Sequence, residues 1–161
     1  MYKSNSIAVA NELITLSDSL YYVDHMKLQK LVYIVYGNWL INHEDACLDE
    51  NPQVWHYGPI FANMYHQLKH NKVNVITEKA MIYNEFPLVE HPDMKYVIAR
   101  VWDKFKNLSG PELSNLTNRP SSPWFNVAKR FDFVVPIDTE IDTDDIKRYF
   151  RESVLLSVLG A

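Results

Sequence analysis

Residues 24–41 read DHMKLQKLVYIVYGNWLI and decide the fold of this 161-residue chain. Apolar side chains recur in this stretch at the helical spacings of three and four: Leu28, Leu31, Val32, Val35 and Trp39. Asp24 precedes them as an expected N-cap, because a carboxylate there accepts hydrogen bonds from the first free N–H groups. Further apolar residues cover most of the helix perimeter, which predicts a central helix packed on several sides. Lys27, Gln29 and Lys30 mark its more solvated start.

The composition is that of one globular domain. A chain of this length buries about two-thirds of its unfolded surface, so it needs neither a disulfide nor a metal to fold. No repeat or Gly/Ser-rich linker divides it, and we expect a single domain over residues 1–161. Cys47 is the sole cysteine, which excludes an intramolecular disulfide and a thiolate-rich zinc site. This cysteine usage is typical of the reducing cytoplasm.

Charge and hydropathy restrict the partners. The net charge of −4 disfavours nucleic acid, whose phosphates require a clustered excess of Lys and Arg. No apolar run is long enough for a signal peptide or a membrane span. We therefore expect a cytoplasmic protein that associates with no membrane.

Other helices follow from periodicity and from capping residues. Apolar spacing predicts helices over residues 6–16 and 93–108. Tyr57-Gly58-Pro59 is interpreted as a turn into a further helix, with the proline in its first turn. Capping signals then begin three more helices: Ser109 with Glu112, Ser122 with Pro123, and the acidic group Asp142, Asp144 and Asp145.

Strand signals are few. Short strands are predicted at residues 73–76, 81–83 and 131–135, the last from alternation of Phe131, Phe133 and Val135. The expected fold is mostly α: a compact single-domain helical bundle with one or two short β-strand segments.

The C-terminal run from Val154 to Leu159 is unusually apolar for a chain end. In the favoured interpretation a final helix docks on the bundle through Ile146, Tyr149, Phe150, Val154 and Val158. The other interpretation is contact with a partner or with a second copy, which leaves a homodimer open.

The sequence contains only weak signals for a catalytic site. His66 and His70 have the spacing of a two-histidine metal helix, but Gln67 stands where a catalytic carboxylate would be needed, and a zinc site needs three or four ligands. No local signature makes Cys47 a nucleophile, and no glycine-rich loop cradles phosphate. We therefore assign no catalytic residue, no metal and no cofactor, and expect that the protein is not an enzyme.

The order of these pieces resembles the Panacea domain, found in antitoxins and in phage-associated proteins once grouped as GepA-like. The resemblance lies in residues 26–33 (MKLQKLVY), residues 54–60 (VWHYGPI) with Tyr65, residues 113–117 with Ser122-Pro123-Trp124, and residues 146–150. The matching positions, expected to be mostly structural, are Lys27, Leu28, Lys30, Leu31, Trp55, Tyr57, Gly58, Pro59, Tyr65, Leu116, Thr117, Trp124 and Phe150. Asn118 replaces a histidine that the family commonly carries, and capping is a role that asparagine can still fill.

The resemblance implies a function in protein binding. It implies neutralisation of a partner protein toxin by direct binding, through an apolar and aromatic patch rimmed by acidic residues. The alternatives are a phage-associated protein acting on host defence and a protease adaptor that delivers a bound protein for degradation. The expected partner is thus a toxin or a host protein. The candidate partner-binding residues are Lys27, Lys30, Tyr57, Leu155, Leu156 and Leu159.

Overall fold

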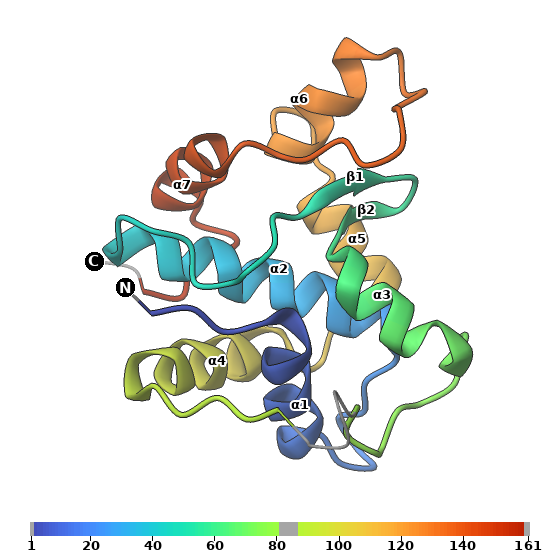
Figure 1. Cartoon of the computed structure of the whole chain (residues 1–161), viewed down its shortest axis with the longest axis vertical. Helices are drawn as coiled ribbons and strands as arrows, with labels where there is room; N and C mark the ends of the chain where they lie inside the picture. The colour runs from blue at the N-terminus through green and yellow to red at the C-terminus, as the bar shows by residue number, and fades with distance from the viewer. Residues whose placement is uncertain (1, 81–86, 160–161) are drawn as a thin grey trace.

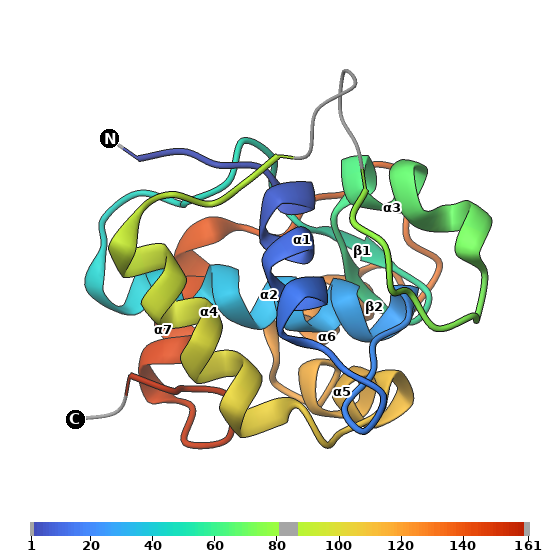
Figure 2. The same ribbon diagram turned by 90° about the horizontal axis from the view of Figure 1, so that it is seen from below.

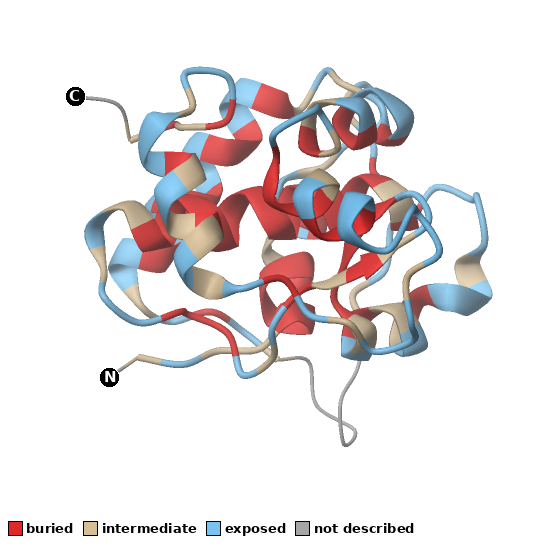
Figure 3. Ribbon diagram, turned by 90° about the horizontal axis from the view of Figure 1, so that it is seen from above, coloured by how far each residue is buried: buried red, intermediate tan, exposed pale blue. Residues whose placement is uncertain are grey.

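Helix α2 (His25–Asn42) is the axis of the fold. The computed structural model describes residues 2–80 and 87–159, and in it the other elements surround α2 (Figures 1 and 2). The Asp24 side chain accepts a hydrogen bond from Lys27 N at 2.8 Å, which confirms the predicted N-cap. Side chains are buried on every side of α2, as its wide apolar stripe predicted (Figure 3).

The mostly α fold is confirmed. Besides α2, the helices of the described residues are α1 (Ser6–Leu16), α3 (Ala62–Leu68), the short 3₁₀ helix η1 (Lys69–Asn71), α4 (Pro92–Phe105), α5 (Gly110–Thr117), α6 (Pro123–Arg130) and α7 (Thr143–Glu152). Helices α1, α3, α4, α5 and α7 all contact α2. None of the helices within residues 2–80 and 87–159 is both long and apolar enough to cross a membrane.

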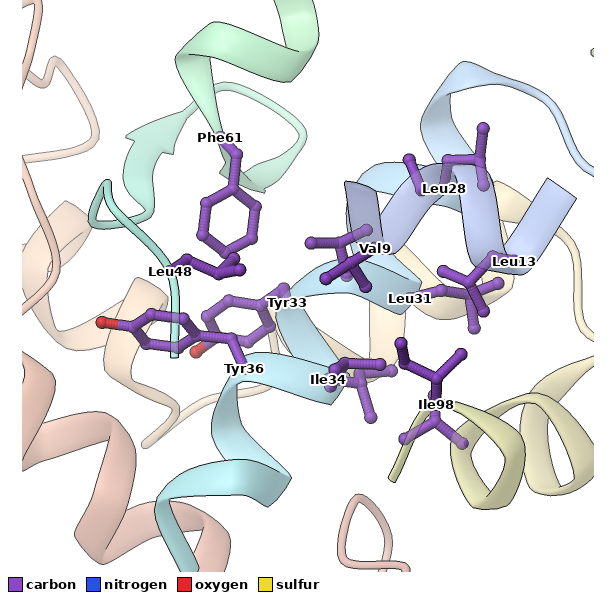
Figure 4. Close-up of a cluster of buried hydrophobic side chains, with 14 of the residues drawn as sticks. Val9, Leu13, Leu28, Leu31, Tyr33, Ile34, Tyr36, Leu48, Phe61 and Ile98 are labelled. Carbon is purple, nitrogen blue, oxygen red and sulfur yellow. The ribbon is translucent and has the colours of Figure 1, made fainter. Parts of the chain in front are cut away.

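The core forms where these helices meet α2. Figure 4 shows part of it, with Val9 and Leu13 from α1, Leu31 and Ile34 from α2, and Ile98 from α4. All five side chains are buried. Because helices pack on α2 from several directions, its start is covered as well. The prediction of a solvated start is wrong: Lys27, Gln29 and Lys30 are buried.

Helix starts follow the local signals closely. Ser109 and Glu112 form the predicted capping box, and Ser122 Oγ accepts from Phe125 N at 3.1 Å. Asp142 caps α7 by accepting from the N–H groups of Asp144 and Asp145. Such caps depend only on residues two or three positions apart, so the sequence is sufficient to predict them.

A small antiparallel β-hairpin projects beside α5 and α6 (Figure 1). Strand β1 (Gln53–Trp55) pairs with β2 (Gly58–Ile60) in the register Gln53↔Ile60, Val54↔Pro59 and Trp55↔Gly58. The prediction that Pro59 lies in the first turn of a helix is therefore wrong. Pro59 lies in strand β2, and α3 begins only at Ala62. Proline is compatible with this position because β2 pairs on one side only.

Two predicted strands are wrong. Val73 lies in a turn after η1, and Val75 and Ile76 are irregular. Residues 131–133 form a turn after α6 and residues 134–135 are irregular, because Asp132 and Phe133 adopt positive φ and cannot continue an extended chain. The predicted strand at residues 81–83 lies outside the described residues. Helix α4 ends at Phe105, three residues before the predicted end.

The C-terminal run docks on the bundle, but not as a helix. Helix α7 ends at Glu152, and the chain then turns so that Leu156 and Val158 are buried while Val154 is exposed. Asn38 of α2 holds this turn: Nδ2 donates to Leu156 O at 2.9 Å and Oδ1 accepts from Val158 N at 2.8 Å. The predicted docking of Val158 is thus confirmed, and that of Val154 is wrong.

Candidate functional site

Lys30 lies in the second turn of α2 and points toward the hairpin. Its side chain is fully buried, and Nζ donates to Pro59 O of β2 at 3.0 Å. None of the described residues offers Lys30 a carboxylate within salt-bridge distance. Burial lowers the pKa of Lys30 to about 7, since the charged ammonium loses its hydration. An amine of this kind stabilises a backbone carbonyl and is closed to solvent.

Gln29 binds the chain just beyond β2. Its Oε1 accepts from Phe61 N at 2.9 Å and its Nε2 donates to Phe61 O at 3.2 Å, so the amide pairs with this residue as a strand would. His25, one turn earlier, lies with Nε2 at 3.2 Å from Gln29 Nε2 and packs its ring near Tyr65. Burial, and then the charge of Lys30, lowers the pKa of His25 to about 4. At neutral pH this histidine is therefore uncharged.

Helix α5 holds the turn of the hairpin. Ser114 Oγ donates to Tyr57 O, and Asn118 Nδ2 donates to Ser114 Oγ at 3.2 Å. Thr117 Oγ1 donates to Ser114 O at 3.1 Å. Asn118 is also the C-cap of α5, through its backbone N–H. The Asn118 side chain thus supports Ser114, and its backbone caps the helix.

Helix α6 holds β1 from the other side. Trp124 Nε1 donates to Trp55 O at 2.9 Å, and the Trp55 ring lies 4.6 Å from that of Tyr65 on α3. We call the side chains of Gln29, Lys30, Ser114 and Trp124 the hairpin cradle, because each bonds the backbone of residues 55–61. Three helices thereby fix one short hairpin.

Gly58 lets the cradle close. Its φ of +124° is rarely adopted by residues with a side chain. A Cβ there would lie 2.6 Å from Asn118 Oδ1 and 3.0 Å from Lys30 Cε. Both the backbone angle and the close approach therefore require glycine, which explains this residue in the motif.

The cradle displays the turn of the hairpin to solvent. His56 and Tyr57 join the strands and are exposed, Tyr57 to 63%. The backbone beneath them is bonded on both sides, so an exposed aromatic side chain is carried on a fixed support. Such an arrangement suits recognition, because little conformational entropy remains to be lost when a partner binds.

The other motif positions serve the bundle. Leu28 and Leu31 are core residues, Leu116 packs against the core, and the Phe150 ring packs against Gly37 of α2. Lys27 is directed away from the hairpin, with Nζ donating to Lys106 O and lying 5.6 Å from the Trp102 ring centroid.

The candidate partner-binding residues divide into two groups. Tyr57 and Leu155 are exposed and Leu159 is partly buried, so all three offer some surface. Lys27, Lys30 and Leu156 are buried, which contradicts their proposed contact with a partner. The lysines bond backbone carbonyls, and Leu156 fills the core beside Asn38.

Sequence reasoning missed Gln29 and Ser114 as cradle members. Both stand inside the motifs, at positions that a helix pattern classes as surface or neutral. Their only signal was a polar side chain within a segment otherwise needed for packing.

The candidate metal and nucleophile positions do not assemble a site. His66 lies on α3, whereas His70 lies in η1 after α3 has ended. Across residues 2–80 and 87–159 no three His, Cys, Asp or Glu side chains are grouped to hold a metal ion. Cys47 is fully buried, and this burial raises the pKa of its thiol, which makes it a weak nucleophile.

These features define a helical scaffold that presents a hairpin held by buried polar side chains. The sequence matches the family described as antitoxin SocA-like, Panacea domain, over residues 28–125. The match spans more than half of the chain, from the first turn of α2 to α6, and includes every cradle residue. The chain therefore belongs to this antitoxin-like family. Neither the curated proteins nor the solved structures contain a match.

Proposed function

We propose that this protein is an antitoxin that neutralises a protein toxin by binding it directly, without catalysis. Membership of the antitoxin-like family carries the proposal. The geometry supports it, because the polar motif residues Lys30, Ser114 and Trp124 bond backbone carbonyls of the hairpin. Groups engaged in this way build a shape and are not placed to act on a substrate.

The proposal assigns selectivity to the surface around the hairpin. The buried cradle supports the display, and exposed side chains outside it contact the toxin. It also places the complex in the cytoplasm and requires no cofactor.

The test is co-production with the toxin encoded by the neighbouring gene. We expect growth to be rescued and the two purified proteins to elute as one complex in size-exclusion chromatography. Intact mass spectrometry of the toxin should show an unchanged mass after exposure to this protein. Rescue without complex formation, or a toxin of altered mass, would contradict neutralisation by binding.

A protease adaptor is the second candidate, because Val154 is 89% exposed and Leu155 lies beside it on the surface. Removing the whole run would expose core around Asn38, so the suitable variant is Val154→Ser with Leu155→Ser. A direct inhibitor leaves the toxin level in cells unchanged, with or without this variant. An adaptor lowers the toxin level, and the double substitution restores it.

A further inference from the structure

An open apolar groove lies beside the hairpin cradle. It has a volume of about 640 Å³, and its lining residues come from β1, α6 and the segment that follows α6. Figure 1 shows where these elements lie. Its lining is dominated by large apolar side chains: Val54, Trp55, Trp124, Phe133, Val134 and Ile137. Trp55 of the hairpin and Trp124 of the hairpin cradle thus also line this groove.

One side of the groove, which we call the outer wall, is formed by residues 133–138 and exposes several large apolar side chains to solvent. Phe133, Val134 and Ile137 are exposed to 54%, 81% and 93%. They stand within five residues of one another and share one groove. A cluster of this kind on a soluble surface is typical of a contact with another macromolecule.

This outer wall is fixed at its α6 end. Phe133 N donates to Ala128 O at 2.8 Å. The Phe133 ring packs against the Phe125 ring, with 5.5 Å between the ring centroids. Asp132, Phe133 and Asp138 adopt positive φ, a region that aspartate tolerates but that is unfavourable for the bulky side chain of Phe133. An unfavourable backbone that is nevertheless held in place is typical of binding segments.

The other end of the wall is tied to the hairpin. Val54 N donates to Thr139 O at 2.9 Å, Ile141 N donates to Pro52 O at 2.9 Å, and Gln53 pairs with Glu140 as a short antiparallel bridge. Thr139 Oγ1 donates to Pro136 O at 2.7 Å. Hydrogen bonds therefore join the two walls of the groove, and the groove is already formed in the chain without a partner.

Charge indicates what the groove accepts. Asp138 is the sole Asp, Glu, Lys or Arg among its lining residues. Residues 132–145 contain six carboxylates and no Lys or Arg, whereas Lys129 and Arg130 end α6 without lining the groove. In the described residues neither Asp132 nor Asp138 forms an ion pair. The complement of this wall is apolar with positive charge beside it.

We propose that this groove is the docking surface for the toxin, and that its occupant is a toxin segment with apolar side chains flanked by Lys or Arg. This inference rests on the proposed antitoxin function and adds the surface and the chemistry of the partner. Apolar side chains enter between Trp124 and Ile137, and a cationic side chain reaches Asp138.

The experiment measures affinity for the purified neighbouring toxin by calorimetry. Val134→Asp and Ile137→Asp are each expected to weaken binding at least tenfold. The control is Val73→Asp, at a valine that follows η1, is exposed to 88% and does not line the groove; this variant should leave binding unchanged. Asp138→Asn is expected to weaken binding several-fold and to reduce its salt dependence. Asparagine suits this position because it tolerates the positive φ of residue 138.

Indole NMR signals report the location independently. Trp55 and Trp124 are expected to shift on toxin addition, whereas Trp39 and Trp102, which do not line the groove, keep their positions. If the toxin binds and is neutralised but the groove variants bind normally and both groove indoles stay fixed, the docking inference is wrong and the antitoxin function stands. If the unaltered chain fails to bind the toxin at all, both fail.

A second copy of this chain is the competing occupant. Sedimentation velocity would then show a dimer that Val134→Asp dissociates, and this result would overturn the assignment of the groove to the toxin. A monomer whose toxin affinity depends on Val134, Ile137 and Asp138 supports it.

Discussion

The ring of Phe150 occupies the space that a side chain on Gly37 would need. A Cβ added to Gly37 would lie 2.3 Å from Phe150 Cε2, and the two residues join α7 to the middle of α2. Phe150 is fully buried and cannot move aside into solvent. The absence of a side chain on α2 therefore determines how closely α7 packs.

Gly37→Ala is accordingly expected to lower the free energy of unfolding by about 1–3 kcal/mol, as overpacked cores do. The gain in helix propensity from glycine to alanine, about 1 kcal/mol, acts in the other direction. Urea unfolding of Gly37→Ala, Phe150→Leu and the double variant measures the coupling. Costs that simply add would contradict direct contact, because neighbouring substitutions that share a clash are not additive.

Tyr33 and Tyr36 provide a matched pair on one helix. The Tyr33 hydroxyl has no hydrogen-bond partner in the described residues, whereas Tyr36 Oη lies 3.2 Å from Thr143 Oγ1. Tyr33→Phe should raise the free energy of unfolding by about 1 kcal/mol, because an unsatisfied buried group is removed. Tyr36→Phe should lower it by about 1 kcal/mol. Equal effects in urea unfolding would argue that Tyr33 is bonded in solution.

Lys30 should make stability depend on pH above neutrality. Its pKa is about 7 in the folded protein and near 10.5 in the unfolded chain, so between these values the unfolded chain binds more protons. Stability therefore rises with pH, by about 1–2 kcal/mol between pH 7 and pH 8.5. Burial also raises the pKa of Cys47, so titration of the unfolded thiol opposes this trend above that window.

Urea unfolding of Lys30→Met at pH 7 and pH 8.5 tests this prediction. The variant should lose the rise in stability, and Lys95→Met, at an exposed lysine, should keep it. A rise of the same size in Lys30→Met would assign the proton release to another group.

Gly58→Ala should lower the free energy of unfolding by about 1–3 kcal/mol, from the positive φ and the contact with Asn118. Adding Asn118→Ala removes this contact but leaves the backbone angle and the approach to Lys30 Cε, so only part of the loss should be recovered. Thermal unfolding of the single and double variants measures this. Complete recovery would show that the backbone angle carries no cost.

Local signals made much of this fold predictable. The apolar stripe of α2 and the caps Asp24, Ser109 and Ser122 depend on residues within a turn or two of each other. The hairpin was harder to predict, because Gly58-Pro59 also resembles the start of a helix. The hydrogen bonds that hold the hairpin come from distant residues: Lys30 bonds the carbonyl of Pro59, and Ser114 bonds that of Tyr57.

The groove shows the opposite failure. Alternation at Phe131, Phe133 and Val135 predicted a strand, since apolar residues at every second position normally face a core. Here Phe133 is largely exposed, and the pattern serves a surface instead. An alternating pattern indicates a strand only if the backbone is extended, and the positive φ of Asp132 and Phe133 breaks it here, so this irregular surface segment and a core strand give the same sequence signal.

The short pairing of Gln53 with Glu140 has a consequence for any attempt to isolate the family-matching part of the chain. Residues 28–125 contain the hairpin but not the later segment that caps the outer edge of β1, nor α1 and α7 that shelter α2. A fragment cut at those limits would carry an unprotected β edge and a stripped apolar helix, both of which recruit other chains. We expect such a fragment to aggregate, so the smallest usable folding unit is longer than the recognisable motif.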